Sequence, residues 1–339
     1  GIGDKRATEI ARQVRQHASH RDALIFLQSL GIQQALANRL WTQLGEKAIT
    51  QVRENPYTLA QTIRGVGFKT ADQIARQLGF APNSPARLAA GLVQALARAA
   101  DEGHVMLPRD ALIERTRTLL GDPLDVDAML DTLVSEGRLV SDEGGVYLRG
   151  VHRAELELSE RLMDLTRTTS TSIGLAHDDA LDLAELKLAD AQKSAVRCAC
   201  ENNIMVLTGG PGTGKTTTVK AMLKALDLQD ESICLAAPTG RAARRLSDAT
   251  GRRAATLHRL LGFHPVDGFR FDEDTPLSAT TVVVDEASML DMNLALALLR
   301  ALSPGTRLIL VGDADQLPSV GPGRVLRDIV ASELVPTVR

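Results

Sequence analysis

The sequence predicts a multidomain protein, in which an all-α region and a small helix-and-hairpin module precede an α/β domain with a parallel sheet. Three observations support this prediction. Glycine turns followed by helical patterns recur in residues 1–82, and three helical patterns followed by a short hairpin occupy residues 83–150. From residue 188 onward, apolar strands alternate with helices, which is the pattern of a parallel sheet covered on both faces.

Composition indicates a globular protein without a membrane span. The chain has 339 residues, 44% of them hydrophobic and 24% charged, which suffices for two or three domains. No run approaches the roughly eighteen apolar residues of a membrane helix. The start at Gly1, without a leader pattern, suggests a fragment. Cys198, Cys200 and Cys234 fit neither a metal pattern nor an even disulfide set, so we expect reduced thiols and a cytoplasmic protein.

Charge is distributed unevenly, although the net charge is only −3. Residues 1–80 carry eleven Lys and Arg against six acids, and residues 238–260 carry six arginines against one acid. Residues 101–190 carry nine basic residues against twenty acids. The two basic regions predict two surfaces that bind polyanions, although solvated helix faces give the same counts.

Three segments of the N-terminal region can be aligned on one another. Residues 1–10, 31–40 and 65–74 each begin with a glycine turn and have Ala at the seventh position and an aliphatic residue at the tenth. Helical patterns at 23–30 and 57–63 precede the two later turns. Copies that start 30 and 34 residues apart predict a repeated helical architecture.

The repeated pattern resembles the helix-hairpin-helix motif, whose G-x-G hairpin presents backbone N–H groups to a nucleic-acid phosphate. On this resemblance, Gly65, Gly67 and Lys69 of the third copy are candidate DNA-binding residues. The second copy has Gln33 in place of the second glycine, so it is the weakest candidate. A helical repeat that only packs is the alternative.

The module predicted for residues 83–150 begins with helical patterns at residues 86–101, 108–120 and 125–137. Residues 138–148 follow as two short strands around a glycine turn. Three helices and a hairpin resemble a winged-helix module. The acidity of this one favours a structural, connecting role over DNA binding.

A connecting helix at 151–168 and a polar linker, together residues 151–187, lead to the α/β domain at 188–339. Its four predicted strands are 204–208, 232–237, 281–285 and 307–312. Ligands of such sheets bind beyond the carboxyl ends of the strands. The loops after these strands are therefore where we expect the chemically active residues.

The first strand leads into G-x-x-x-x-G-K-T, which predicts a P-loop. Its glycines let the backbone wrap around phosphate, and the next helix contributes its positive N-terminal end. Lys215 can reach the β- and γ-phosphates of ATP, and Thr216 can ligate Mg²⁺. An ordinary strand–helix turn is the alternative, and the complete motif argues against it. The predicted ATP-binding residues of the loop are Gly210, Pro211, Gly212, Thr213, Gly214, Lys215, Thr216 and Thr217.

Polar residues follow two later strands. Asp285 is predicted to hold Mg²⁺ with Thr216, and Glu286 to act as the general base that orients water toward the γ-phosphate. Gln316 follows the last strand and can sense the γ-phosphate. With Lys215, Glu286 and Gln316 form the predicted catalytic set. Upstream, the Gln192 amide can pair with adenine, although a lone Gln on a helix is more often a surface residue.

Six motifs then make a family resemblance specific. They are Gln192, GGPGTGKT at 209–216, LAAPTGRAA at 235–243, TLHRLL at 256–261, VDEAS at 284–288 and GDADQLPSVGPG at 312–323. They occur in the order found in superfamily 1 helicases and most resemble the RecD-like branch, superfamily 1B. The hairpin repeats resemble those of the long-form RecD proteins. The resemblance implies a RecA-like fold for residues 188–339, with ATP and Mg²⁺ as cofactors.

The resemblance also implies DNA contacts. It places Pro238, Thr239 and His258 beside single-stranded DNA, and a Thr hydroxyl near backbone N–H groups suits a phosphate. Arg241 and Thr256 lie in the same motifs, although arginines there can also solvate helices. Phe263 belongs to an inserted hairpin, 1B, at about residues 262–280. In the family this hairpin acts as a pin at the duplex junction, where aromatic residues can stack on bases, and a small core under the insertion is the alternative.

The function implied by the resemblance is that of an ATP-dependent 5′→3′ DNA helicase or translocase in DNA repair or recombination. We expect a monomer, near the bacterial nucleoid, that acts on single-stranded DNA and duplex junctions, away from membranes, with single-strand-binding or repair proteins as partners. RecD-like helicases have a second RecA-like domain that supplies arginines to the γ-phosphate. This chain ends about where that domain should begin, so we expect these residues alone to hydrolyse ATP poorly. The alternatives are a DNA-binding scaffold with a nucleotide-sensing P-loop, and the helicase half of a relaxase–helicase.

Overall fold

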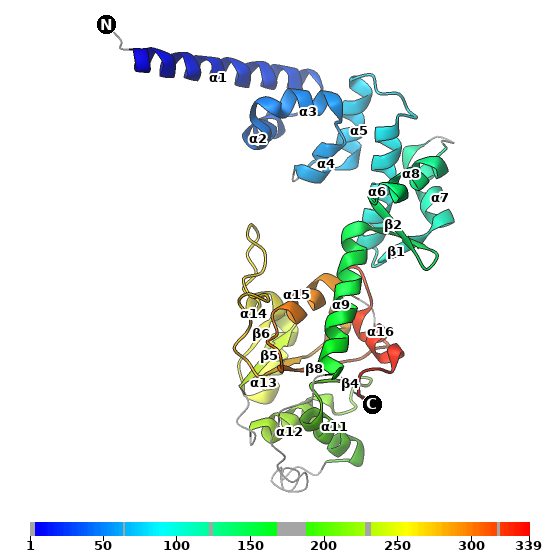
Figure 1. Cartoon of the computed structure of the whole chain (residues 1–339). Coiled ribbons are helices and arrows are strands. Elements are labelled where there is room, and N and C mark those ends of the chain that lie inside the picture. Colours follow the sequence, from blue (N-terminus) through cyan, green and yellow to red (C-terminus); the bar gives the residue numbers. More distant parts are fainter. Residues whose placement is uncertain (1–3, 64, 122–124, 168–187, 228–231, 317–318) are drawn as a thin grey trace. The chain divides into compact units, whose positions relative to one another are not determined.

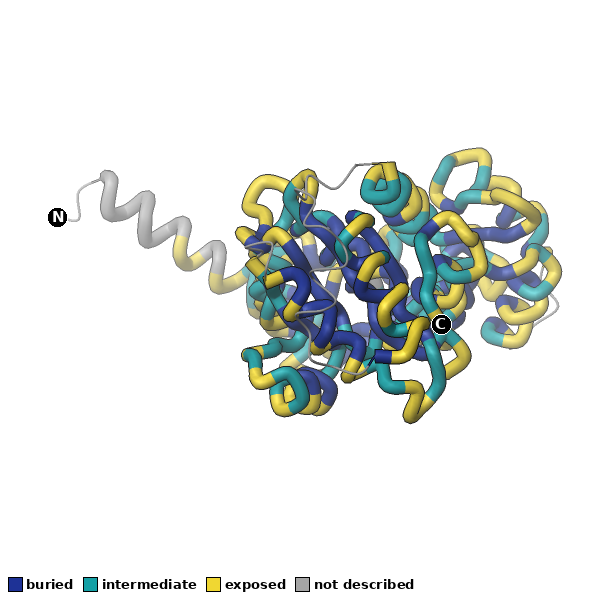
Figure 2. The backbone as a smooth tube through the Cα atoms, turned by 90° about the horizontal axis from the view of Figure 1, so that it is seen from below, coloured by how far each residue is buried: buried dark blue, intermediate teal, exposed yellow. Residues whose placement is uncertain are grey.

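The computed structural model describes residues 4–63, 65–121, 125–167, 188–227, 232–316 and 319–339, without the side chains of residues 4–12, 15, 16 and 61 (Figure 1). The chain divides into two compact units. Unit 1 comprises residues 1–98 and 107–148, and unit 2 comprises residues 99–106 and 149–339. Each unit has its own buried core (Figure 2).

Unit 1 begins with helices only. They are α1 (Asp4–Ser29), α2 (Gln34–Leu44), the 3₁₀ turn η1 (Gly45–Lys47), α3 (Ala48–Glu54), α4 (Thr58–Thr62), α5 (Phe68–Gln77) and α6 (Pro85–Asp101). The second and third glycine turns lie before α2 and α5, as predicted. Their shared seventh-position alanines, Ala37 and Ala71, are fully buried, and Leu40 and Ile74 at the tenth position are 0% and 2% exposed. The repeated positions are therefore core positions.

The first copy differs from the prediction. The glycine turn predicted at residues 1–3 lies outside the described residues. Residues 4–10 continue without interruption into α1, so the helix predicted at 23–30 is the last part of this 26-residue helix. The segment from 4 to 29 contains neither Gly nor Pro, so nothing in the local sequence stops the helix.

A buried polar network joins the helical repeats to α6. Arg87 is 2% exposed, and its Nε donates to Asp72 Oδ1 at 2.7 Å while its Nη2 donates to the Leu120 carbonyl at 3.1 Å. The Tyr57 hydroxyl donates to the same Asp72 oxygen at 2.8 Å. Burial raises the pKa of Asp72, but the hydrogen bonds from Arg87 and Tyr57 outweigh burial and hold this pKa below its ordinary value. Residues on both sides of the predicted border at 82 thus pack together, and Tyr57, Phe68 and Leu88 belong to one buried cluster.

The rest of unit 1 is built as the helix-and-hairpin pattern predicts. Helices α7 (Arg109–Leu120) and α8 (Asp127–Ser135) precede strands β2 (Leu139–Asp142) and β3 (Gly145–Leu148), which pair antiparallel. A third strand, β1 (Met106–Pro108), was not predicted and gives the sheet order β1-β3-β2.

Unit 2 contains the α/β domain, and its predicted fold class is confirmed. A six-stranded sheet has the order β6-β5-β7-β8-β4-β9, and its paired strands run parallel. The strands are β4 (Ile204–Thr208), β5 (Ile233–Ala237), β6 (Ala254–Thr256), β7 (Thr281–Val284), β8 (Arg307–Gly312) and β9 (Thr337–Val338). The four longer strands are the predicted ones, and β6 and β9 were missed.

Helices cover both faces of this sheet (Figure 1). They are α9 (Arg149–Arg167), α11 (Asp190–Glu201), α12 (Lys215–Asp227), α13 (Gly240–Thr250), α14 (Leu257–Leu260), η2 (Ala287–Met289), α15 (Met292–Arg300) and α16 (Val325–Ser332). Alternate residues of β4 enter different cores: Ile204 and Val206 pack with α15 and α16, and Met205 and Leu207 pack with α11 and α12. The apolar strands follow from burial on both faces.

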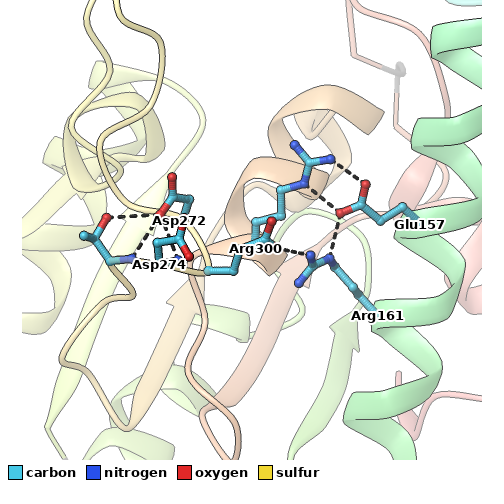
Figure 3. A network of polar contacts seen from close by, with 7 residues as sticks. Glu157, Arg161, Asp272, Asp274 and Arg300 are labelled. Atoms are coloured by element: carbon cyan, nitrogen blue, oxygen red, sulfur yellow. Dashed lines mark hydrogen bonds and ion pairs between the residues drawn. The ribbon is translucent and has the colours of Figure 1, made fainter.

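The connecting helix α9 is fixed to unit 2 by ion pairs (Figure 3). Glu157 accepts hydrogen bonds from Arg300 Nε at 2.7 Å and from Arg161 Nε at 2.9 Å, and Arg161 also pairs with Glu273 of the insertion. The hydrogen bond from Arg300, then the one from Arg161, lowers the pKa of Glu157 to about 2. The helix predicted at 151–168 begins two residues earlier, at Arg149. Its contacts with Arg300 and Glu273 make it part of unit 2. Most of the predicted linker, residues 168–187, lies outside the described residues.

The insertion at 262–280 is a loop rather than a regular hairpin. His264 and Gly268 form an isolated antiparallel bridge, with N–H to carbonyl distances of 2.7 and 2.9 Å, so the predicted Asp267–Gly268 turn is present without flanking strands.

In the described part of the chain, none of the helices has the length and apolar character that crossing a membrane requires.

Candidate nucleotide site and nucleic-acid contacts

The predicted P-loop connects the fully buried strand β4 to α12, which begins at Lys215. Gly214 has φ = +83°, a conformation that side-chain-bearing residues rarely adopt. A Cβ atom there would also lie 2.7 Å from Nε2 of Gln192. The backbone conformation thus favours glycine at 214, and a Cβ atom there would displace the Gln192 amide. A glycine-rich loop of this kind can wrap around phosphate.

The side chain of Lys215 folds back over the loop. Its Nζ donates to the carbonyl oxygens of Gly209 and Gly210, the latter at 2.9 Å. Thr213 Oγ1 donates to the Gly210 carbonyl at 3.0 Å, and Thr216 and Thr217 are exposed at the start of the helix. The loop therefore brings together one positive charge, several hydroxyl groups and the N-terminal end of a 13-residue helix. These groups suit the phosphates of a nucleotide.

Gln192 lies beside the loop rather than on open surface. Its Oε1 accepts from the Ala189 N–H at 3.0 Å at the start of α11, and its Nε2 faces Gly214. The hydrogen bond from Ala189 thus holds the amide next to the loop. The predicted pairing with adenine remains a prediction.

Asp285 and Glu286 follow directly after β7. Asp285 Oδ1 accepts from the Glu286 N–H at 2.9 Å. Burial raises the pKa of Asp285, the charge of Glu286 raises it further, and the charge of Lys215 opposes both. A half-buried carboxylate beside a second carboxylate fits a divalent cation, and Asp285 with the Thr216 hydroxyl offers the oxygen ligands that Mg²⁺ prefers.

Glu286 has an unusual backbone. Its φ and ψ are +54° and +40°, in the left-handed region, and it is one of three residues other than glycine with positive φ among the described residues. Its carboxylate lies 3.7 Å from the Arg245 guanidinium of α13. The strained backbone is the kind of feature that clusters at functional sites.

Gln316 lies in the loop after β8, which is the sheet strand between β7 and β4. Its Nε2 donates to Asp313 Oδ2 at 3.2 Å. The neighbouring Ala314 N–H donates to Thr208 Oγ1 at the end of β4, at 3.2 Å. Because the three strands are parallel neighbours, the loops with Lys215, Asp285 and Gln316 share one edge of the sheet. Leu317 and Pro318 of this motif lie outside the described residues.

The DNA-binding candidates of unit 2 follow β5 and β6, which pair in register at Ala237 and Thr256. Thr239 and Thr256 each cap a helix: their Oγ1 atoms accept from Ala242 N–H at 3.3 Å and Arg259 N–H at 3.2 Å. Pro238 is half-buried beside Thr239, and Arg241 is exposed. Two capped helix starts side by side form a surface that can accept phosphate.

An aromatic cluster lies at the base of the insertion. The ring of His258 is 5.3 Å from that of Phe263 and 5.9 Å from that of Phe269. Phe263 is 46% exposed, whereas Phe269 and Phe271 pack against the core of unit 2. The core alternative thus applies to Phe269 and Phe271, whereas His258 and Phe263 remain accessible and stacking on bases stays a prediction for them.

In unit 1, Gly65 and Gly67 form the turn before α5, and Lys69 is exposed on the first turn of that helix. Arg39 of α2 approaches this turn, because its guanidinium nitrogens lie 3.5 Å from the position of a Cβ at Gly65. Sequence analysis missed Arg39 and the Arg245–Glu286 contact. The local sequence carries no signal for either contact, because the partners come from distant segments.

Comparisons with known proteins agree with this arrangement. Residues 16–106 match a family described as the ATP-dependent RecD2 DNA helicase HHH domain, and residues 192–322 match an AAA domain family. An ATP-dependent RecD2 DNA helicase of Deinococcus radiodurans is 36% identical over 359 residues, covering 100% of this chain and 49% of that protein. The RecBCD enzyme subunit RecD of Mycobacterium tuberculosis is 46% identical over 164 residues, covering 42% of this chain and 28% of that protein.

A third relative, the ATP-dependent DNA helicase dda of phage T4, is 36% identical over 148 residues, with coverage of 40% and 34%. The chain spans about half the length of the first of these relatives, and less of the other two.

Proposed function

Because the chain belongs to the RecD-like helicases, we propose that the protein is an ATP-dependent 5′→3′ DNA helicase of repair or recombination. The observation that supports this best is the meeting of the three loops with Lys215, Asp285 and Gln316 at one edge of the parallel sheet. The capped helix starts after β5 and β6 lie at the same edge, because their strands are parallel to the others. A nucleotide site and a DNA surface can therefore be linked through one sheet.

In this proposal Lys215 neutralises the β- and γ-phosphates of ATP, and Glu286 takes a proton from the attacking water. Asp285 and Thr216 hold Mg²⁺, which neutralises charge on the phosphates when it is bound. Gln316 exchanges its bond to Asp313 for one to the γ-phosphate, and this exchange reports hydrolysis to the loop after β8. Gln192 contacts adenine.

The accessible pair His258 and Phe263 is proposed to stack on bases at a junction. Pro238, Thr239, Arg241 and Thr256 are proposed to contact the backbone of the DNA strand.

We further propose a monomer near the nucleoid, with single-strand-binding or repair proteins as partners. The predicted borders at residues 82, 150 and 187 are kept as proposed domain limits.

Strand displacement by the full-length protein tests the function. Duplexes with a 5′ tail should be separated with ATP, whereas duplexes with a 3′ tail, or a non-hydrolysable ATP analogue, should give no product. A requirement for a 3′ tail would reverse the proposed direction. Displacement supported by the analogue would favour the scaffold with a nucleotide-sensing P-loop instead.

The hairpin repeats make a separate prediction. Lys69→Ala should weaken binding of duplex DNA and lower the slope of log affinity against log salt by about one unit, because one phosphate contact is lost. Fluorescence anisotropy at several salt concentrations measures this slope. Lys47 in the last turn of η1 provides the control Lys47→Ala. Equal slopes for both variants and the parent chain would leave the repeats with a packing role only.

A further inference from the structure

A concave site lies at the amino end of α16, and no P-loop residue is among those that line it. It has a volume of about 270 Å³ and is lined by Ser288, Asp315, Gln316, Arg324 and Arg327, among others. The proposed mechanism gives no role to Ser288, Arg324 or Arg327.

The walls of this pocket are fixed by the close approach of three elements at Gly312. A Cβ atom at Gly312 would lie 2.8 Å from Cδ2 of Leu326, on α16, and 3.0 Å from the Ser288 N atom of η2. Only glycine lets the end of β8 contact both segments. The pocket is therefore built into the packing of the domain.

Two arginines give the pocket its charge. Among the described residues, neither Arg324 nor Arg327 has a carboxylate within the 4.0 Å of an ion pair. Burial raises the pKa of the neighbouring Asp328, and the Arg324 N–H and both guanidinium charges oppose it. Asp315 is the acid of the lining, so the lining carries one net positive charge. An anion is favoured there.

A buried hydroxyl adds a second observation. In the described part of the chain, Ser288 Oγ is inaccessible to solvent and has no hydrogen-bond partner. A buried hydroxyl without a partner destabilises a protein, whereas an oxyanion in the pocket would accept its hydrogen. The eight-residue α16 also directs its positive end toward this place.

We infer that this pocket binds a phosphate group through Arg324, Arg327 and Ser288. Guanidinium groups match phosphate oxygens with paired N–H donors, which gives both charge and geometry. The phosphate comes either from the backbone of single-stranded DNA or from free inorganic phosphate. Gln316 lines the pocket as well, so a phosphate bound here contacts the loop that is proposed to sense the nucleotide.

The first arm of the test follows inorganic phosphate by ³¹P NMR line broadening on the 339-residue chain. A Lys215→Ala background removes the P-loop as a competing site. Broadening should persist in this background and with the control Arg153→Ala, an exposed arginine on α9. It should fall at least fivefold with Arg324→Ala or Arg327→Ala. Both arginines are exposed, so the variants should fold, which thermal melting checks.

The second arm measures binding of an oligo(dT) strand by anisotropy. If the ligand is the DNA backbone, each arginine variant lowers the salt slope by about 0.7 and weakens binding about five- to tenfold at low salt. A loss confined to the phosphate arm identifies free phosphate as the ligand. Arginine variants that match Arg153→Ala in both arms would overturn the inference. Because the phosphate arm needs neither ATP turnover nor unwinding, it can fail or succeed independently of the proposed helicase activity.

Discussion

Replacing Glu286 with glutamine is expected to lower ATP turnover about 10²- to 10⁴-fold while ATP binding is kept. Glutamine has the size and polarity of glutamate but cannot take a proton from water. The carboxylate is half-buried after β7, next to Asp285, and is the base proposed for the γ-phosphate step. DNA-stimulated ATPase rates of the full-length protein, with binding of a fluorescent nucleotide measured in parallel, give the two quantities.

Two further variants distinguish the loss of the catalytic base from a general loss of nucleotide binding. Lys215→Ala should weaken nucleotide binding itself, because it removes the positive charge over Gly209 and Gly210. Arg153→Ala, at an exposed position of α9, is the control and should change neither quantity. Turnover by Glu286→Gln within threefold of the parent rate would mean that another group activates the water.

Arg87→Ala is expected to destabilise unit 1 by about 3–5 kcal/mol, the usual cost of removing one partner from a buried ion pair. The change leaves Asp72 charged and 8% exposed, with only Tyr57 and the mostly exposed Arg76 as partners. It also leaves the Leu120 carbonyl without its donor. Urea unfolding followed by circular dichroism measures the change.

An exposed ion pair of the same unit provides the control. Arg109 pairs with Asp131 at 2.7 Å, but the two side chains are 42% and 67% exposed, so Arg109→Ala should cost less than about 1 kcal/mol. The double variant Asp72→Ala/Arg87→Ala should be less destabilised than the sum of its single variants, because no lone charge remains. A loss below 1 kcal/mol for Arg87→Ala would contradict the buried-pair argument.

The sheet was predictable wherever a strand is long and buried on both faces. Strands β4 and β8 contain apolar runs of four residues, at 204–207 and 308–311, and helices α12 and α15 lie in the intervals between the strands. Strands β1, β6 and β9 have three, three and two residues. Segments this short become strands only because a neighbouring strand supplies hydrogen bonds, and the local sequence does not contain that information.

The candidate site was likewise predictable only in part from the sequence. The order of motifs indicated which loops carry Lys215, Asp285 and Gln316, because parallel strands bring their ends to one edge. Contacts between side chains from distant segments were not predictable, such as Gln192 against Gly214 or Arg245 against Glu286. They depend on how α11 and α13 pack on the sheet. The continuous α1, by contrast, could have been predicted from the absence of Gly and Pro between residues 4 and 29.

The left-handed backbone of Glu286 has a consequence for how this protein can change. Such a conformation costs a residue other than glycine about 1–3 kcal/mol, so glycine at 286 would relax the chain and remove the carboxylate in one step. Selection for heat resistance alone would favour that exchange, and selection for turnover would forbid it. If Glu286 is the base that we propose, thermal stability and enzymatic turnover are opposed at this position, and a glutamate here favours turnover.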